Sequence, residues 1–288
     1  MLLNTYEPWK FAFSSENEDI KENSFGIIGV PFDSTVSYHS GSRLGPIVVR
    51  EASFGFEKYN TIFNKELSTI FYDFGDVNVI PGNCEKTCQI VEDTVNEMLD
   101  LNLKPIIIGG EHSVSIGSLK ALSEKYGKLT VVHLDAHRDL AFEFIGEKYS
   151  HATVMRRIHE LGADLVQIGI RSSSADEEEF VKSTYNIHTF KNKDVHKHMD
   201  AIEYFLTNIE GPVYISIDMD VVDPAFAPSV GNPTPGGLFI SEMETILETL
   251  SHKDIVGFDV VETASNRLGD STAVVASKLI YDFLTLIG

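Results

Sequence analysis

Val131-Val132-His133-Leu134-Asp135-Ala136-His137-Arg138-Asp139 is the stretch of this chain that decides its fold, because an apolar run ends abruptly in charged side chains. Two other stretches share this construction: Ile106-Ile107-Ile108-Gly109-Gly110-Glu111-His112 and Val213-Tyr214-Ile215-Ser216-Ile217-Asp218-Met219-Asp220. An isolated carboxylate costs several kcal/mol to bury. Three apolar runs that each lead into Asp or His therefore predict three buried strands whose ends meet around a shared positive charge.

Short apolar runs alternate with longer amphipathic segments along almost the whole chain. The expected strands are residues 25–30, 69–73, 105–108, 130–134, 165–170, 188–190, 213–218 and 255–261. The expected helices are residues 45–53, 85–101, 116–126, 150–161, 177–183, 195–209, 241–251 and 271–287. This alternation is typical of βαβ units, and such continuous apolar strands are buried on both faces. We predict an α/β fold with three layers, α/β/α, and a central, mostly parallel, eight-stranded sheet.

One domain over residues 1–288 is the economical interpretation, because no linker, repeat or low-complexity tract interrupts the pattern. Residues 1–24 precede the first expected strand and are interpreted as an irregular N-terminal arm. The proline-rich stretch 225–237 follows one of the three decisive strands. Loops of that length within a domain are usually functional.

The formal net charge of −20 and the predicted pI of about 4.8 restrict the class of partner. Nucleic-acid binding is not expected, because affinity for phosphates comes mostly from Lys and Arg. A small cationic substrate is compatible with this charge, since a negative field concentrates cations near the protein. Solubility alone also accounts for such a charge.

The chain has two cysteines, Cys84 and Cys88, too few to close a structural zinc site but ordinary in a reducing compartment. We see no signal peptide and no run of about 18 apolar residues. The expected location is therefore the cytoplasm, with no membrane partner.

The charged side chains after the three strands have the spacing of a shared metal site. Side chains two residues apart on a strand point to the same side, which groups Asp135, His137 and Asp139, and likewise Asp218 and Asp220. His112, after Gly109-Gly110, adds a sixth donor. The four carboxylates balance two divalent ions, and carboxylate with imidazole suits manganese. A pair of such ions generates a hydroxide nucleophile from water at neutral pH.

With these blocks the sequence resembles the ureohydrolase family, that of arginase and agmatinase, and it looks most like the bacterial agmatinases. The resemblance extends from about Gly26 to the C-terminus. It also includes the stretches Gly29-Val30-Pro31-Phe32-Asp33, Gly41-Ser42-Arg43-Leu44-Gly45-Pro46, Pro235-Gly236-Gly237-Leu238 and Phe258-Asp259-Val260-Val261-Glu262. It implies the arginase-like form of the α/β/α fold and a homo-oligomer, either a trimer or a hexamer.

The resemblance also implies a role for each site residue. One Mn²⁺ would be held by His112, Asp135, Asp139 and Asp218, and a second by His137, Asp135, Asp218 and Asp220. A metal-bridging hydroxide would attack the guanidinium carbon of the substrate. The substrate-binding residues would be Glu262, which orients the guanidinium, and His151, which shuttles protons. Asp139, His151 and Glu262 would be the catalytic residues, with Asp139 passing a proton to the departing amine before urea is released.

The substrate is inferred from the interval between Asp139 and His151. Arginases carry there a run of hydroxyl and amide residues that bind the amino-acid end of arginine, whereas residues 140–150 contain Glu143 and Glu147 instead. This favours agmatine, which is cationic at both ends and would give urea and putrescine.

Alternatives remain open. Arginine, guanidinobutyrate or formiminoglutamate could be the substrate, and an acid of this kind would need a basic residue such as Arg138, Arg156 or Arg171 near its distal end. A non-catalytic metal-binding relative would be expected to lack ligands. Arg138, Asn232 and Thr234 depart from residues that are frequent in the family.

Overall fold

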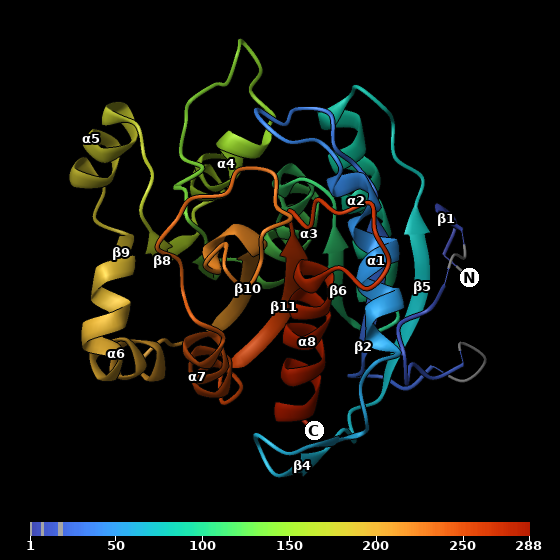
Figure 1. Cartoon of the computed structure of the whole chain (residues 1–288). Coiled ribbons are helices and arrows are strands. Elements are labelled where there is room, and N and C mark those ends of the chain that lie inside the picture. Colours follow the sequence, from blue (N-terminus) through green and yellow to red (C-terminus); the bar gives the residue numbers. More distant parts are fainter. Residues whose placement is uncertain (1, 7–8, 17–19) are drawn as a thin grey trace.

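The computed structural model describes residues 2–6, 9–16 and 20–288 (Figure 1). Its centre is a nine-stranded sheet with the order β1-β5-β2-β6-β11-β10-β7-β8-β9. The strands of this sheet are β1 (Thr5–Tyr6), β2 (Phe25–Val30), β5 (Phe71–Val77), β6 (Lys104–Gly109), β7 (Thr130–Leu134), β8 (Asp164–Ile170), β9 (Ile187–Lys191), β10 (Pro212–Asp218) and β11 (Asp254–Val261). All neighbours pair in parallel except β1, which is antiparallel to β5.

The eight predicted strands all form and make up the parallel part of the sheet, so the predicted α/β fold is confirmed. The ninth strand, β1, comes from the arm that we expected to be irregular. Residues 1, 7–8 and 17–19 of that arm lie outside the described part of the chain. A small antiparallel hairpin, β3 (Tyr59–Asn60) with β4 (Lys65–Glu66), was not predicted either.

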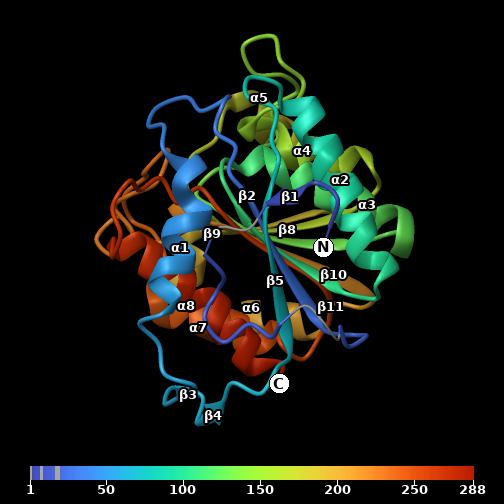
Figure 2. The same cartoon turned by 90° about the vertical axis from the view of Figure 1, so that its right-hand side faces the viewer.

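Helices cover both faces of the sheet (Figures 1 and 2). One layer contains α1 (Gly45–Ser53), α6 (Asn192–Thr207), α7 (Ile240–Leu250) and α8 (Ser271–Leu286). The other contains α2 (Cys84–Asp100), α3 (Ser115–Tyr126) and α4 (Val154–Glu160), and α5 (Ala175–Ser183) contacts α4 through Phe180. Each layer encloses its own hydrophobic core against the sheet. No helix within the described residues is both long and apolar enough to cross a membrane.

The middle of the sheet positions the functional side chains. The neighbours β6, β11, β10 and β7 end at the same edge, because parallel strands share one direction. In open α/β sheets, ligands bind at the carboxyl ends of the strands. The three decisive stretches of the sequence therefore converge there, and β11 adds a fourth chain segment.

Gly109 and Gly110 lead from β6 into the site, and neighbouring atoms leave no room for a side chain at either position. Neither has a positive φ. A Cβ on Gly110 would lie 2.0 Å from the carbonyl oxygen of Phe32, and one on Gly109 would lie 2.6 Å from Val261. Close packing of neighbouring segments, rather than backbone freedom, requires both glycines.

Candidate metal centre and active site

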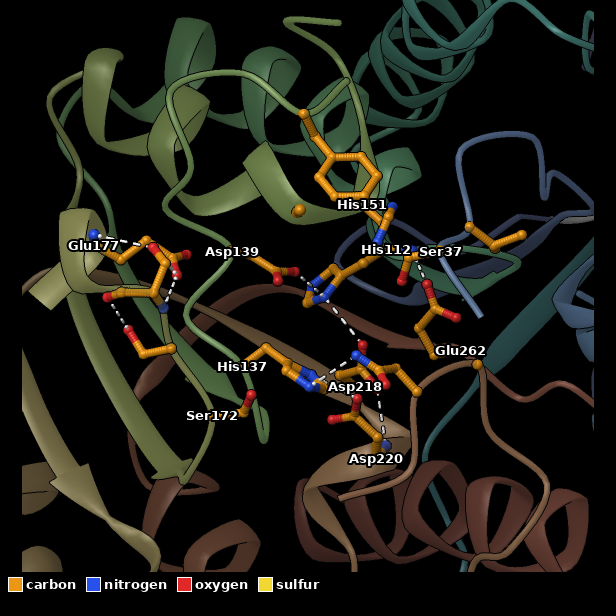
Figure 3. Close-up of a pocket in the computed structure, with 17 residues that line it drawn as sticks. Ser37, His112, His137, Asp139, His151, Ser172, Glu177, Asp218, Asp220 and Glu262 are labelled. Carbon is orange, nitrogen blue, oxygen red and sulfur yellow. Dashed lines mark hydrogen bonds and ion pairs between the residues drawn. The ribbon is translucent and has the colours of Figure 1, made fainter. Parts of the chain in front are cut away.

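A pocket opens at the carboxyl ends of these central strands (Figure 3). Seven of the eight predicted site residues line it, and these are His112, His137, Asp139, His151, Asp218, Asp220 and Glu262. The eighth, Asp135, is fully buried and contacts both His112 and His137. The structure thus brings all eight predicted residues together.

The first group of donors surrounds the His112 ring. Its Nδ1 lies 3.2 Å from Asp135 Oδ2, 3.1 Å from Asp139 Oδ2 and 3.3 Å from Asp218 Oδ2. This nitrogen is buried but has no partner with hydrogen-bond geometry. On the other side of the ring, Nε2 lies 2.9 Å from the Ser216 hydroxyl. A buried nitrogen facing three carboxylates without a hydrogen bond fits a shared metal ion.

The second group of donors surrounds the His137 ring. Its Nδ1 lies 2.9 Å from Asp220 Oδ2 and 3.5 Å from Asp135 Oδ1. Asp135 therefore presents one carboxylate oxygen to each group. Asp220 Oδ1 accepts a hydrogen bond from the Ala136 backbone N–H at 3.0 Å, which ties the end of β10 to the segment after β7.

The electrostatics of this cluster call for cations. Burial, and then the charge of Asp135, raise the pKa of Asp139 to about 6. Burial also raises the pKa of Asp218, and the neighbouring Asp220 and Asp135 raise it further. His137 loses affinity for its proton through burial, but bonds to Asp135 and Asp220 outweigh this and raise its pKa to about 12. The raised pKa values mean that protons bound to these side chains compensate the negative charge of the cluster. The same oxygen and nitrogen donors suit divalent metal ions that bind carboxylate and imidazole.

A hydrogen-bonded chain behind Asp135 was missed by sequence reasoning. Arg138 can only donate, so its Nη1 fixes the Gln167 Oε1 as acceptor at 2.9 Å. The Gln167 amide then donates to His133 Nδ1 at 3.1 Å, and His133 Nε2 donates to Asp135 Oδ2 at 2.8 Å. Glu178 also accepts from Arg138, at 2.6 Å. The signal was available, because His133 stands two residues before Asp135 on the same side of the strand.

Glu262 and Asp139 share an unusual backbone conformation. Their φ values are 64° and 53°, in the left-handed region that non-glycine residues rarely adopt. Glu262 Oε1 accepts a hydrogen bond from the His112 backbone N–H at 2.9 Å. Burial raises the pKa of Glu262 to about 8, with Glu111 as the next cause. Its carboxylate faces the pocket beside the metal-site candidates (Figure 3).

His151 lines the same pocket (Figure 3), and its ring packs against that of Phe144. The two rings meet edge to face, with centroids 5.0 Å apart. Burial, and then the charges of His112 and His137, lower the pKa of His151 to about 4. This histidine is therefore neutral near pH 7.

The anionic wall of the pocket differs from our expectation. Glu143 and Glu147 are exposed and do not line the pocket, whereas Glu177 on α5 does, near Ser172–Ser174. The Glu177 carboxylate accepts from the Leu140 and Ser174 backbone N–H groups, at 2.9 and 2.8 Å, and forms no ion pair with a described residue.

Each of the three candidate arginines is engaged elsewhere. Arg138 is buried behind Asp135 and donates to Gln167. Arg171 donates to four backbone carbonyls. The guanidinium carbon of Arg156 lies 3.8 Å from the centroid of the Phe180 ring. No Lys or Arg is found among the described residues that line the pocket.

Asn232, one of the departures from the family pattern, contacts the site. Its side-chain amide lies 3.1 Å from His137 Nε2. Thr234 lies nearby, with its hydroxyl 3.4 Å from the same nitrogen. The proline-rich stretch 225–237 is thus part of the site, as its length predicted.

Comparisons with known proteins agree with this geometry. The family model described as the Arginase family matches residues 23–285. An uncharacterized 32.2 kDa protein of Methanothermus fervidus is 42% identical over 283 residues, which cover 96% of this chain and 98% of that protein. Agmatinase of Pyrococcus horikoshii is 36% identical, with 98% of this chain and 97% of the relative covered.

Two further proteins bear on the substrate. N(1)-aminopropylagmatine ureohydrolase of Thermococcus kodakarensis is 37% identical, with 97% of this chain and 95% of the relative covered. The crystal structure of agmatine ureohydrolase of Thermoplasma volcanium is similar with a TM-score of 0.86 and 32% identity, covering 98% of this chain and 95% of that one.

Proposed function

Because this chain belongs to the arginase family and is similar to its agmatinases over almost its whole length, we propose that it hydrolyses the guanidino group of agmatine to urea and putrescine. The observation that carries the choice of substrate is the charge of the pocket. Its described lining has acidic side chains at both ends, Glu262 beside the candidate metal donors and Glu177 near Ser172–Ser174, and no Lys or Arg. A pocket of this kind suits a substrate that is cationic at both ends.

We propose two Mn²⁺ as the cofactor. His112, Asp135, Asp139 and Asp218 would hold one ion, and His137, Asp135, Asp218 and Asp220 the other. Support comes from the orphaned His112 Nδ1 and from Asp135, which presents an oxygen to each histidine. When bound, such ions lower the pKa of a water molecule so that hydroxide is available at neutral pH.

The remaining steps belong to side chains of the chain itself. Glu262 would accept two N–H groups of the guanidinium, since a carboxylate matches that planar, forked donor. Asp139, held beside His112, would carry a proton to the departing amine. His151, neutral near pH 7, would accept a proton from the site and exchange it with solvent.

A second candidate substrate is an aminopropyl-extended agmatine. The name of the relative from Thermococcus kodakarensis motivates it. Ser172–Ser174 and Glu177 could receive an additional amine. Guanidinobutyrate, arginine and formiminoglutamate fit less well, because an acidic substrate needs a cationic partner and the three candidate arginines are engaged elsewhere. A non-catalytic relative is disfavoured, since all six donors are present and grouped.

Urea release tests this proposal. The manganese-loaded protein is incubated separately with agmatine, aminopropylagmatine, arginine and 4-guanidinobutyrate, and urea is measured. Urea from agmatine at a kcat/KM well above that of the acids supports the proposal. A higher kcat/KM for aminopropylagmatine than for agmatine would assign the longer molecule as the substrate. Two bound manganese ions without urea from any substrate would contradict it.

Glu262→Gln is the matched test of the substrate-binding role. The amide keeps the size of the side chain but presents one acceptor and one donor to the guanidinium. We expect kcat/KM for agmatine to fall about 100-fold or more, because an oriented charge-assisted contact is lost. Manganese content, measured by elemental analysis, should stay the same. Wild-type turnover in this variant would show that the role is assigned to the wrong residue.

A further inference from the structure

Glu111 is a buried carboxylate that no role assigned above explains. It is 0% exposed and accepts four hydrogen bonds. The Ser34 and Thr35 backbone N–H groups donate to Oε2 at 2.6 and 2.7 Å. The Thr35 and Ser113 hydroxyls donate to Oε1, each at 2.6 Å. Four donors fill the four lone-pair positions of an ionised carboxylate, which can only accept.

Thr35 connects this carboxylate to His151. The Thr35 hydroxyl oxygen accepts the His151 backbone N–H at 3.0 Å and lies 3.2 Å from His151 Nδ1. A hydroxyl has one proton and two lone pairs. Its proton is directed to Glu111, so it can only accept from the histidine ring. Nδ1 must then carry the ring proton of a neutral His151.

From this chain of contacts we propose that Glu111 and Thr35 act as positioning residues that hold His151 in its Nδ1–H tautomer. The other ring nitrogen, Nε2, then has a free lone pair on the ring edge away from Thr35. His151 lines the pocket, whereas Thr35 does not, so this lone pair is the one available to the site. The catalytic use of that lone pair rests on the proposed function, in which His151 accepts a proton. The tautomer follows from the hydrogen bonds alone and does not depend on the proposed function.

The arrangement also restricts how the ring can turn. The backbone N–H and the ring Nδ1 of His151 share one hydroxyl, and Phe144 packs against the ring edge to face. A flipped ring would place a carbon atom against the Thr35 oxygen and lose that contact. The same two residues therefore set both the tautomer and the orientation of the ring.

Two substitutions at Thr35 separate this role from simple packing. Thr35→Val keeps the shape of the side chain and removes the hydroxyl. Thr35→Ser keeps the hydroxyl and removes a methyl group. If the Thr35 side chain acts only through packing, Thr35→Val should have the smaller effect. If its hydroxyl fixes the tautomer, Thr35→Ser should have the smaller effect.

The test is ¹⁵N NMR of the full chain with labelled histidine, saturated with diamagnetic Mg²⁺ near pH 7, with His151 assigned through His151→Asn. Wild type and Thr35→Ser should show a protonated Nδ1 and an unprotonated Nε2, and Thr35→Val should shift toward the opposite tautomer. With manganese and agmatine, Thr35→Val should lower kcat about 10-fold or more with little change in KM, and Thr35→Ser should stay within about 3-fold.

A protonated Nε2 in the wild type would overturn the inference, because Thr35 would then donate to His151. An unchanged Nδ1–H tautomer in Thr35→Val would overturn it as well. Should the valine variant not fold, the wild-type spectrum still decides. The spectra need no turnover, so absence of urea from every substrate would count against the proposed function and leave this inference standing.

Discussion

Asp139 and Glu262, which both line the pocket, have left-handed backbone conformations. Each such residue costs of order 1 kcal/mol or more and persists only if its surroundings hold it. The Asp139 carbonyl accepts from the Arg156 N–H at 3.2 Å, and the Glu262 N–H donates to the Gly110 carbonyl at 2.8 Å. These contacts turn both carboxylates toward the candidate metal donors instead of along the strand.

Gly231 leaves the space that the Glu262 carboxylate occupies, and Gly231→Ala tests this. A Cβ there would lie 2.6 Å from Glu262 Oε2. Because the obstructed atom ends a flexible side chain, we expect the fold to tolerate alanine while kcat/KM for agmatine falls about 10-fold or more. Steady-state kinetics and thermal unfolding measure the two effects. In a Glu262→Ala background the same substitution should change nothing further, and a full additional loss would contradict the explanation.

His151 makes stability depend on pH in a predictable direction. Its pKa falls from the usual 6.5 to about 4, mainly through burial. As pH drops below 6.5, His151 becomes protonated in the unfolded chain, whereas in the folded chain it stays neutral until about pH 4. Relative to His151→Asn, the metal-free wild type should therefore lose about 3 kcal/mol of unfolding free energy between pH 7 and pH 4. Chemical denaturation across this range measures the difference, and a constant difference would place the pKa near its usual value.

At the scale of the element, prediction succeeded where one physical signal dominated. Strands such as β6, β7 and β10 are continuous apolar runs that end in charge, and burial on both faces demands that composition. The strand β1 and the hairpin of β3 and β4 have two residues per strand, too few for any period to show.

The site divides in the same way. Donors at the strand ends follow a period of two, and the structure places them close together. Glu177 comes from a helix that only tertiary packing brings to the pocket, and Thr35 from a loop that packing places against His151, so no local pattern marks them. Glu143 and Glu147 lie closer in sequence to the metal-site candidates, yet the loop between Asp139 and His151 turns them to solvent. Proximity along the chain was the wrong guide there.

Strand β8 supports its neighbour β7 through Gln167, and Gln167→Leu tests that support. Leucine would remove the acceptor of Arg138 Nη1 and the donor to His133 Nδ1, which we expect to cost about 3 kcal/mol of unfolding free energy. Manganese affinity should also fall about 10-fold or more, because His133 would no longer be oriented toward Asp135. Denaturant unfolding and isothermal titration measure both.

Thr189→Val is the control for that experiment, since the Thr189 hydroxyl contacts Arg138 at 3.1 Å without reaching His133. It should reduce stability and leave manganese affinity unchanged. Equal manganese affinity in the two variants would show that the chain through His133 has no influence on the metal centre.

On the scale of the whole molecule, a chain of net charge −20 concentrates part of that charge in the interior. Asp135, Asp139, Asp218 and Asp220 are all buried around two histidines. Such a cluster opposes folding unless cations neutralise it. Binding energy for metal ions is thus linked to the free energy of the fold.

Metal removal should therefore lower the melting temperature. If each of two ions is present at about 100 times its dissociation constant, binding adds about 5 kcal/mol and raises Tm by on the order of 10 °C. Because so acidic a surface also attracts Mn²⁺ weakly, Asp218→Asn is the control. It removes one of the clustered carboxylates and hardly changes the surface. Its metal-free Tm should exceed that of the wild type, and its rise with Mn²⁺ in calorimetry should be much smaller. Equal rises in both proteins would mean that the ions act at the surface and not between the strand ends.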